Sequence, residues 1–348
     1  MIKKPIRFLA GAALAGALLQ GAAHAGPVSA LEAMRTHNVI VFDDFRLEQD
    51  IKGSLYVDGH LGGRGNGMVG SGYSGYSGGS GLTVTGDVVG QNIRVKNSDV
   101  RVGGNVTGSI EVHDRGSALI GGQNTGSVRL TGNTSGRGVH TNVADAAPAL
   151  NQADFASLSA SLAALTAESL YSASDITDRN NFRIHAADRN NDGIAVVSLG
   201  ADFFDHLASY VIAADAITSL DTIVVNVAGL DINLEANWLS SSAGSNLFGS
   251  QHIIWNFFEA ETVNLSRQIF GSVLAPNAIV TNTSSIEGNV VAGGFTQRAQ
   301  VNLPGYAGTR LASALPASGP VAVSEPAVVG LLGIGALGIA ALRRKKRA

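Results

Sequence analysis

A glycine recurs every 18 residues in the first half of the chain, at Gly86, Gly104 and Gly122. Each follows a short run of alternating apolar residues, and the first two precede Asp or Asn. Alternation at every second residue is typical of strands, and Gly followed by Asp or Asn is typical of tight turns. A fixed period of short strands and turns predicts a β-solenoid, in which each coil buries its inward side chains against its neighbours. An antiparallel meander with coincidental spacing is the alternative.

A similar pattern returns in the last third of the chain, where Gly271 and Gly288 lie 17 residues apart. Between the two repeats, residues 154–170 carry apolar side chains at steps of three and four, which predicts a helix with one apolar face. These side chains are Phe155, Leu158, Leu162 and Leu165. We expect this helix to pack against the solenoid. The predicted fold class is mainly β, a β-solenoid or β-helix-like domain with one flanking α-helix.

Residues 62–81 are rich in Gly and Ser and contain two Gly-Tyr-Ser units. Because this composition offers little to bury, we expect a mobile surface loop. The pattern G-x-G-x-x-G occurs at residues 65–70 and again at residues 333–338. Neither match follows a strand and opens a helix, so neither predicts a nucleotide site.

The N-terminus has the order of a secretory signal. Three basic residues precede an apolar run over residues 8–19, and the small residues Ala23 and Ala25 follow. This order predicts a cleavable signal peptide over residues 1–25, cut after Ala25. An uncleaved membrane anchor is the alternative.

The C-terminus ends in an apolar and then a basic segment. Ser324, Glu325 and Pro326 precede an uncharged stretch over residues 327–342. The basic residues that follow are Arg343, Arg344, Lys345, Lys346 and Arg347. A helix of 16 residues would be about 24 Å long, against a hydrocarbon core of ~30 Å. We therefore expect a marginal transmembrane helix with its basic end in the cytoplasm and the preceding chain outside.

This C-terminal order resembles the PEP-CTERM sorting signal that exosortases process, over residues 324–348. Ser324 stands where the usual motif has Pro. The resemblance implies an exosortase as processing partner, and contact with the membrane through the C-terminal helix before processing. Residues 315–319 (LPASG) resemble the sortase motif L-P-x-T-G and give an alternative anchor.

The charge balance changes once the two ends are set aside. Of the 24 Lys and Arg residues, 3 lie in residues 1–25 and 5 in residues 324–348. Of the 27 Asp and Glu residues, only Glu325 lies in either of these two segments. The segment between them therefore has a net charge of about −10, which argues against nucleic acid as a partner. The absence of cysteine excludes disulfides and thiolate metal sites.

One segment resembles half of a calcium-binding loop. Asp188, Asn190 and Asp192 place oxygen ligands at alternate positions, and Gly193 follows. Leu199 occupies the twelfth position, where a bidentate Glu is required, so a complete EF-hand is excluded. A partial Ca²⁺ site is one interpretation, and an ordinary Asx-Gly surface turn is the other.

The sequence contains no recognisable catalytic set. The histidines are scattered, and no G-x-S-x-G elbow occurs. Acidic pairs such as Asp43 with Asp44 and Glu259 with Glu261 leave a polysaccharide-cleaving enzyme as the alternative. The aromatic run at residues 255–258 predicts a core strand, with a sugar-stacking platform as the other interpretation. The Thr-x-Thr pairs Thr83/Thr85 and Thr281/Thr283 are typical of an ice-binding face, although two pairs do not make a ladder.

Several segments together resemble the choice-of-anchor A family, most specifically at residues 271–278 and 286–291. The resemblance extends over residues 30–308 and implies a β-helical surface domain associated with adhesion, without known catalytic residues. Ice-binding adhesins are a more distant likeness of architecture. The predicted organisation is a signal peptide (1–25), this domain (26–308), a linker (309–323) and the sorting signal (324–348).

These observations predict an exported, non-catalytic protein of the cell surface or extracellular matrix of a Gram-negative bacterium. The expected partner is an extracellular polysaccharide or matrix polymer, because a repetitive face suits a repetitive ligand. No cofactor is expected apart from the possible Ca²⁺.

Overall fold

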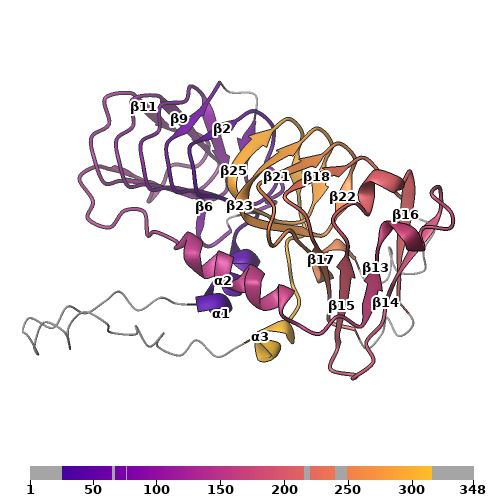
Figure 1. Cartoon of the computed structure of the whole chain (residues 1–348). Coiled ribbons are helices and arrows are strands. Elements are labelled where there is room, and N and C mark those ends of the chain that lie inside the picture. The colour runs from indigo at the N-terminus through magenta and orange to yellow at the C-terminus, as the bar shows by residue number, and fades with distance from the viewer. Residues whose placement is uncertain (1–25, 65–66, 76, 215–219, 240–248, 316–348) are drawn as a thin grey trace, which may run out of the picture. The chain divides into compact units, whose positions relative to one another are not determined.

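Parallel strands stacked coil on coil form the body of the molecule, as a computed structural model shows (Figure 1). The structure describes residues 26–64, 67–75, 77–214, 220–239 and 249–315, which belong to one compact unit. Every strand pairing in those ranges is parallel. The solenoid prediction is therefore confirmed, and the antiparallel meander is excluded.

The first half of the chain builds a stack that grows in sequence order. Its main sheet contains β1 (Val39–Val41), β3 (Leu55–Val57), β6 (Ser80–Val84), β8 (Asp99–Val102), β10 (Ala118–Ile120) and β12 (Val139–His140). The periodic glycines lie above one another, because the Gly104 N–H donates to the Gly86 carbonyl at 3.0 Å and the Gly122 N–H to the Gly104 carbonyl at 2.9 Å. The 18-residue period is thus one turn of the coil.

The second half builds a stack that grows back toward the first. Its main strands are β13 (Ser169–Tyr171), β15 (Ile194–Leu199), β17 (Thr222–Val227), β20 (Ile253–Asn256), β23 (Ser272–Asn282) and β25 (Val290–Gln297). The last of these, β25, pairs with β1. The first and last strands of this sheet in sequence order, β1 and β25, are therefore neighbours at its middle. The strands at its two edges, β12 and β13, follow one another in the sequence.

The remaining strands form the other sides of the coils. They are β2 (Phe45–Leu47), β4 (Leu61–Gly63), β5 (Met68–Val69), β7 (Ile93–Lys96), β9 (Ser109–His113), β11 (Ser127–Leu130), β14 (Phe182–Ala186), β16 (Ser209–Ala214), β18 (Asp231–Leu234), β19 (Asn237–Trp238), β21 (Thr262–Leu265), β22 (Ile269–Phe270), β24 (Ile286–Glu287) and β26 (Val301–Asn302). Four of these strands, β14, β16, β18 and β19, belong to residues 169–239, so coils continue through the segment that separates the two sequence repeats.

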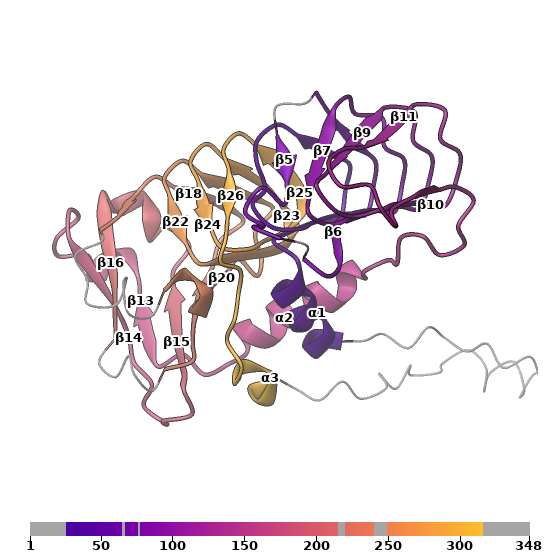
Figure 2. The ribbon, with the colours of Figure 1, turned by 180° about the vertical axis from the view of Figure 1, so that it is seen from behind.

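Helix α2 (Gln152–Ala163) carries the chain from one end of the stack to the other. It ends at Ala163 rather than near residue 170, because residues 169–171 pair with β15 instead. The Asn151 side chain accepts a hydrogen bond from the Ala153 N–H at the start of the helix. Helices α1 (Gly26–Thr36) and α3 (Leu311–Ala314), which the sequence patterns did not predict, lie on the same side of the body (Figure 2).

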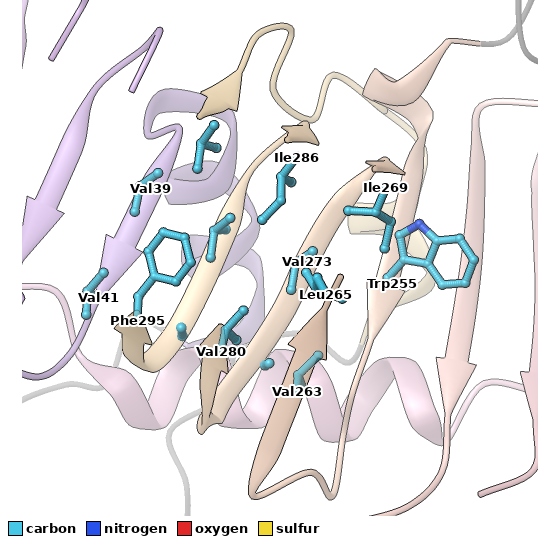
Figure 3. Close-up of a cluster of buried hydrophobic side chains, with 14 of the residues drawn as sticks. Val39, Val41, Trp255, Val263, Leu265, Ile269, Val273, Val280, Ile286 and Phe295 are labelled. Carbon is cyan, nitrogen blue, oxygen red and sulfur yellow. The ribbon is translucent and has the colours of Figure 1, made fainter. Parts of the chain in front are cut away.

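Two apolar layers hold these parts together. The coils enclose the larger one, which includes Val39, Phe295 and the fully buried Trp255 (Figure 3). The second lies between the main sheet and the helices and includes Ile40, Leu274 and Leu162. The aromatic run near residue 255 is therefore part of a core strand, as expected.

The expectation of a mobile loop over residues 62–81 is wrong for its first half. Val69 is buried and bridges to Ile51 of the neighbouring coil. Gly63 has a φ of +132°, and a Cβ there would lie 2.6 Å from the Leu47 carbonyl oxygen. Glycine in this segment thus permits close contact between coils.

The Asp221 carboxylate anchors residues 309–310, which directly precede α3, to the coils. The Asp221 carboxylate accepts hydrogen bonds from the backbone N–H groups of Thr309 and Arg310 and from the hydroxyls of Thr309 and Thr222. Partial burial acts to raise the pKa of Asp221, but these four donors outweigh it, and the pKa is lowered.

We expect Leu162→Asp to lower the free energy of unfolding by several kcal/mol, because Leu162 is fully buried and the new charge would lie in an apolar layer. Chemical denaturation would measure the change. Ala160→Asp is the matched control, because Ala160 is an exposed position of the same helix. Equal stability of the two variants would contradict the packing of α2.

We expect the contact between Asp221 and residues 309–310 to weaken in acid. A carboxylate with a lowered pKa stabilises the folded state at pH values above its unfolded pKa of about 3.9, and this contribution is lost as the pH falls through the lower, folded pKa. Hydrogen exchange at the Thr309 and Arg310 amides should therefore accelerate, relative to the intrinsic rate, below about pH 4. In Asp221→Asn these amides should be weakly protected at every pH. Unchanged protection in that variant would refute the role of the carboxylate.

Candidate binding face

One side of the solenoid presents aligned polar side chains to solvent. We call this side, formed by β18, β21, the second half of β23 and β25, the ladder face. Strand register places its outward residues in two rows. One row is Asp231, Thr262, Ile279 and Gly294, and the other is Asn233, Asn264, Thr281 and Thr296.

Alternation along each strand determines which side chains point outward. The residues between the two rows, Ile232, Val263, Val280 and Phe295, are all buried in the coil interior. The residues of the rows are exposed or half-buried, and Ile279 is 57% exposed. Helices α1 and α2 lie on the opposite side of the body (Figure 1), so neither of them covers the ladder face.

Hydrogen bonds between neighbouring coils hold these side chains in place. The Thr262 hydroxyl donates to Asp231 Oδ1 at 2.8 Å, and Asn264 Nδ2 donates to Asn233 Oδ1 at 3.0 Å. A carboxamide has two donors and one acceptor oxygen with two lone pairs, so each Asn keeps hydrogen-bonding capacity for a ligand. The row members of β18 and β21 are therefore held by these hydrogen bonds before any ligand binds.

The spacing of the grid follows from β geometry. Neighbouring strands lie about 4.8 Å apart, and alternate residues along a strand about 6.6 Å apart. Equivalent groups thus repeat at a fixed interval along the solenoid axis. Such a surface can make the same contact many times to a ligand that repeats.

The face continues onto the first stack. The rings of Phe45 and Phe295 stack with centroids 5.7 Å apart, which places β2 beside β25. Arg46 of β2 is in register with Gly62, and the Arg46 side chain is exposed. Beyond them, Thr107 and Thr125 directly follow the bridged residues 106 and 124 and are exposed.

The predicted threonine pairs divide between two sides of the molecule. Thr281 belongs to the ladder face, and Thr283 follows it along the chain and is exposed. Thr83 is only 4% exposed and lies in the main sheet, in register with Tyr56 of the helix-covered layer. Sequence reasoning thus identified one part of the face and missed Asn233 and Asn264.

The calcium-loop residues form a turn that binds its own backbone. Asp188 accepts hydrogen bonds from the N–H groups of Asp192 and Gly193, and Asp192 accepts one from Ile194. Asn190 accepts from the Asp192 N–H and donates to the Asp192 carboxylate. Across the described ranges, no group of three His, Cys, Asp or Glu side chains could hold a metal ion. The geometry is that of an Asx turn, and the Ca²⁺ expectation stays a prediction.

The two acidic pairs also support turns. Asp44 accepts a hydrogen bond from the His60 N–H at 2.7 Å, and Glu259 accepts one from the Gly229 N–H at 2.7 Å. Both contacts join successive coils. The structure thus gives these two carboxylates a role in holding coils together.

The processing motifs lie outside the described residues. This applies to the cleavage residues Ala23 and Ala25, to Ser324, Glu325 and Pro326, and to the basic end at residues 343–347. Within the part of the chain that the structure describes, no helix is long and apolar enough to cross a membrane.

Comparison with known proteins gives one family match that extends over most of the chain. Residues 30–303 match the family described as "Putative Ice-binding-like adhesive domain". The chain belongs to this family of adhesive, ice-binding-like domains, which are typically non-catalytic.

Among solved structures, the chain is similar to an ice-binding protein from the Antarctic ascomycete Antarctomyces psychrotrophicus, at 12% identity and a TM-score of 0.29. That match covers 80% of this chain and 97% of the fungal chain. The comparison with curated proteins gave no match.

Proposed function

We propose that this protein is an exported adhesin of the choice-of-anchor A type that binds an extracellular polysaccharide through the ladder face. The observation that carries the proposal is the pair of Asn233 and Asn264, which are aligned in register, joined by a hydrogen bond and exposed. The adhesive family supports the class of function.

A polysaccharide suits this face for two reasons. Amide, hydroxyl and carboxylate groups form hydrogen bonds with sugar hydroxyls, and the rows consist largely of such groups. A polymer of repeating sugars can engage several coils at once, so contacts that are individually weak add up within one complex.

The two ends of the chain support an extracellular location. The N-terminal secretory signal directs export of the domain from the cytoplasm. An exosortase processes the tail at residues 324–348. Leu315 packs in the helix layer, so the chain leaves the described domain on the side opposite the ladder face.

We expect the double variant Asn233→Ala/Asn264→Ala to bind the producing cell's own exopolysaccharide about tenfold more weakly, because each lost hydrogen bond contributes about 0.5–1.5 kcal/mol. Pull-down and calorimetry with the purified full-length protein would measure this. Gln300→Ala, at an exposed position on another side of the coil, should bind as the parent does. Equal losses in both variants would contradict a role for the ladder face.

The same preparation separates the competing functions. Thermal hysteresis that disappears in the double variant would identify ice as the ligand of this face. Release of reducing or unsaturated ends that vanishes on changing a single carboxylate would identify a polysaccharide-cleaving enzyme. Binding without turnover is the result that the adhesin proposal expects.

Sorting is tested separately by mass analysis of the protein recovered from the producing cell. We expect an N-terminus at Gly26 and loss of the apolar stretch together with everything after it, residues 327–348. Recovery of an intact basic end would indicate simple membrane anchoring, and linkage at Ser318 would indicate a sortase.

A further inference from the structure

A cavity of about 610 Å³ lies on the helix-covered side of the first stack, beside the C-terminal end of α1. Its walls come from the end of α1 and the loop after it, from β6 and β8, and from the Gly/Ser segment before β6. We call it the Arg101 pocket, after the residue of β8 that points into the helix-covered side. It belongs to the main sheet and is separate from the ladder face.

Arg101 gives this pocket a positive charge without a counter-ion. Its Nη1 donates to the Ala146 carbonyl at 3.2 Å, and within the described ranges no carboxylate lies at ion-pair distance from the guanidinium. The described residues that line the pocket include no Asp or Glu. A guanidinium has five N–H donors in a planar fork that matches a carboxylate, so most of its donors are left for a ligand.

Other lining groups suit a ligand with hydroxyl groups. The side chains of Thr36, Ser80 and Thr83 supply hydroxyls, and Thr83 is 4% exposed. His37 Nδ1 lies 3.1 Å from the Ala33 carbonyl and 3.0 Å from the Thr36 hydroxyl. Burial lowers the pKa of His37, so the ring is neutral near pH 7. A neutral imidazole has one N–H donor and one acceptor nitrogen, and either can pair with a sugar hydroxyl.

We propose that the Arg101 pocket binds a single carboxylated sugar, with the carboxylate on the Arg101 guanidinium and the ring hydroxyls on the Thr83 and His37 side of the cavity. The volume lies within the ~300–1,000 Å³ typical of small-molecule sites. This site is additional to the polysaccharide contact of the ladder face and does not depend on it.

Titration of the full-length protein with D-glucuronate, followed by calorimetry or saturation-transfer NMR, tests the proposal. The expected result is saturable binding of glucuronate, at least tenfold weaker binding of D-glucose, and no saturable binding of acetate. Equal binding of glucose would overturn the carboxylate assignment, and equal binding of acetate would overturn the sugar assignment. Absence of glucuronate binding would overturn the site altogether.

Variants locate the site. Arg101→Gln should weaken glucuronate binding at least tenfold, whereas Arg129→Gln, an exposed arginine of β11 outside the pocket, should leave it unchanged. Thr83→Val provides a second test that retains Arg101 and its contact with Ala146, and it should also weaken binding. Unchanged affinity in both pocket variants, with the parent melting temperature, would refute the proposal. Loss of exopolysaccharide binding in the ladder-face variant with glucuronate binding retained would show that the two sites are independent.

Discussion

The pairing of β1 with β25 is the contact on which the rest of the molecule depends. It joins Val39 to Val290, at the point where two oppositely growing stacks meet. Buried amides fix the register there. Asn38 donates to the Gly288 carbonyl at 2.8 Å and accepts from the Gly53 N–H at 3.0 Å, and Asn289 donates to the Met34 carbonyl at 2.9 Å. Without this pairing, each stack would expose an unpaired edge and an open apolar interior, and buried amides would lose partners that stabilise them.

Much of the fold could be predicted from the sequence because coils of equal length leave a visible period. The glycines of the first stack repeat every 18 residues, and each bonds directly to the next. In the second stack, side loops of different length hide the period. Thr262 follows its ladder-face neighbour Asp231 by 31 residues, but precedes the next one, Ile279, by only 17. The meeting of β1 and β25 could not be read from any local pattern, since it depends on residues about 250 positions apart.

The residues of the ladder face were also only partly predictable from local sequence patterns. Thr281 was visible as part of a Thr-x-Thr pair, but Asn233 and Asn264 lie in separate strands with no shared motif, and only the register of β18 with β21 aligns them. The extent of α2 was overestimated because residues 169–171 have an alternative partner in β15, which a helical pattern cannot reveal. The position of α2 is also set by polar contacts that carry no sequence signal. Ser159 donates to Asn256 at 2.6 Å, and Asn226 donates to the Leu162 carbonyl at 2.9 Å.

The placement of the C-terminal coil at the middle of the stack has a mechanical consequence. In a solenoid that grows in one direction, the last coil is an end coil, and tension on the C-terminus can peel coils away one at a time. Here β25 has neighbours on both sides, and the segment after it is held by Asp221 and by Arg35, whose Nε donates to the Gly308 carbonyl at 3.0 Å. A force applied at residue 315 would therefore act on a segment anchored at Asp221 and Arg35 and on a strand that is paired on both sides, rather than on an end coil.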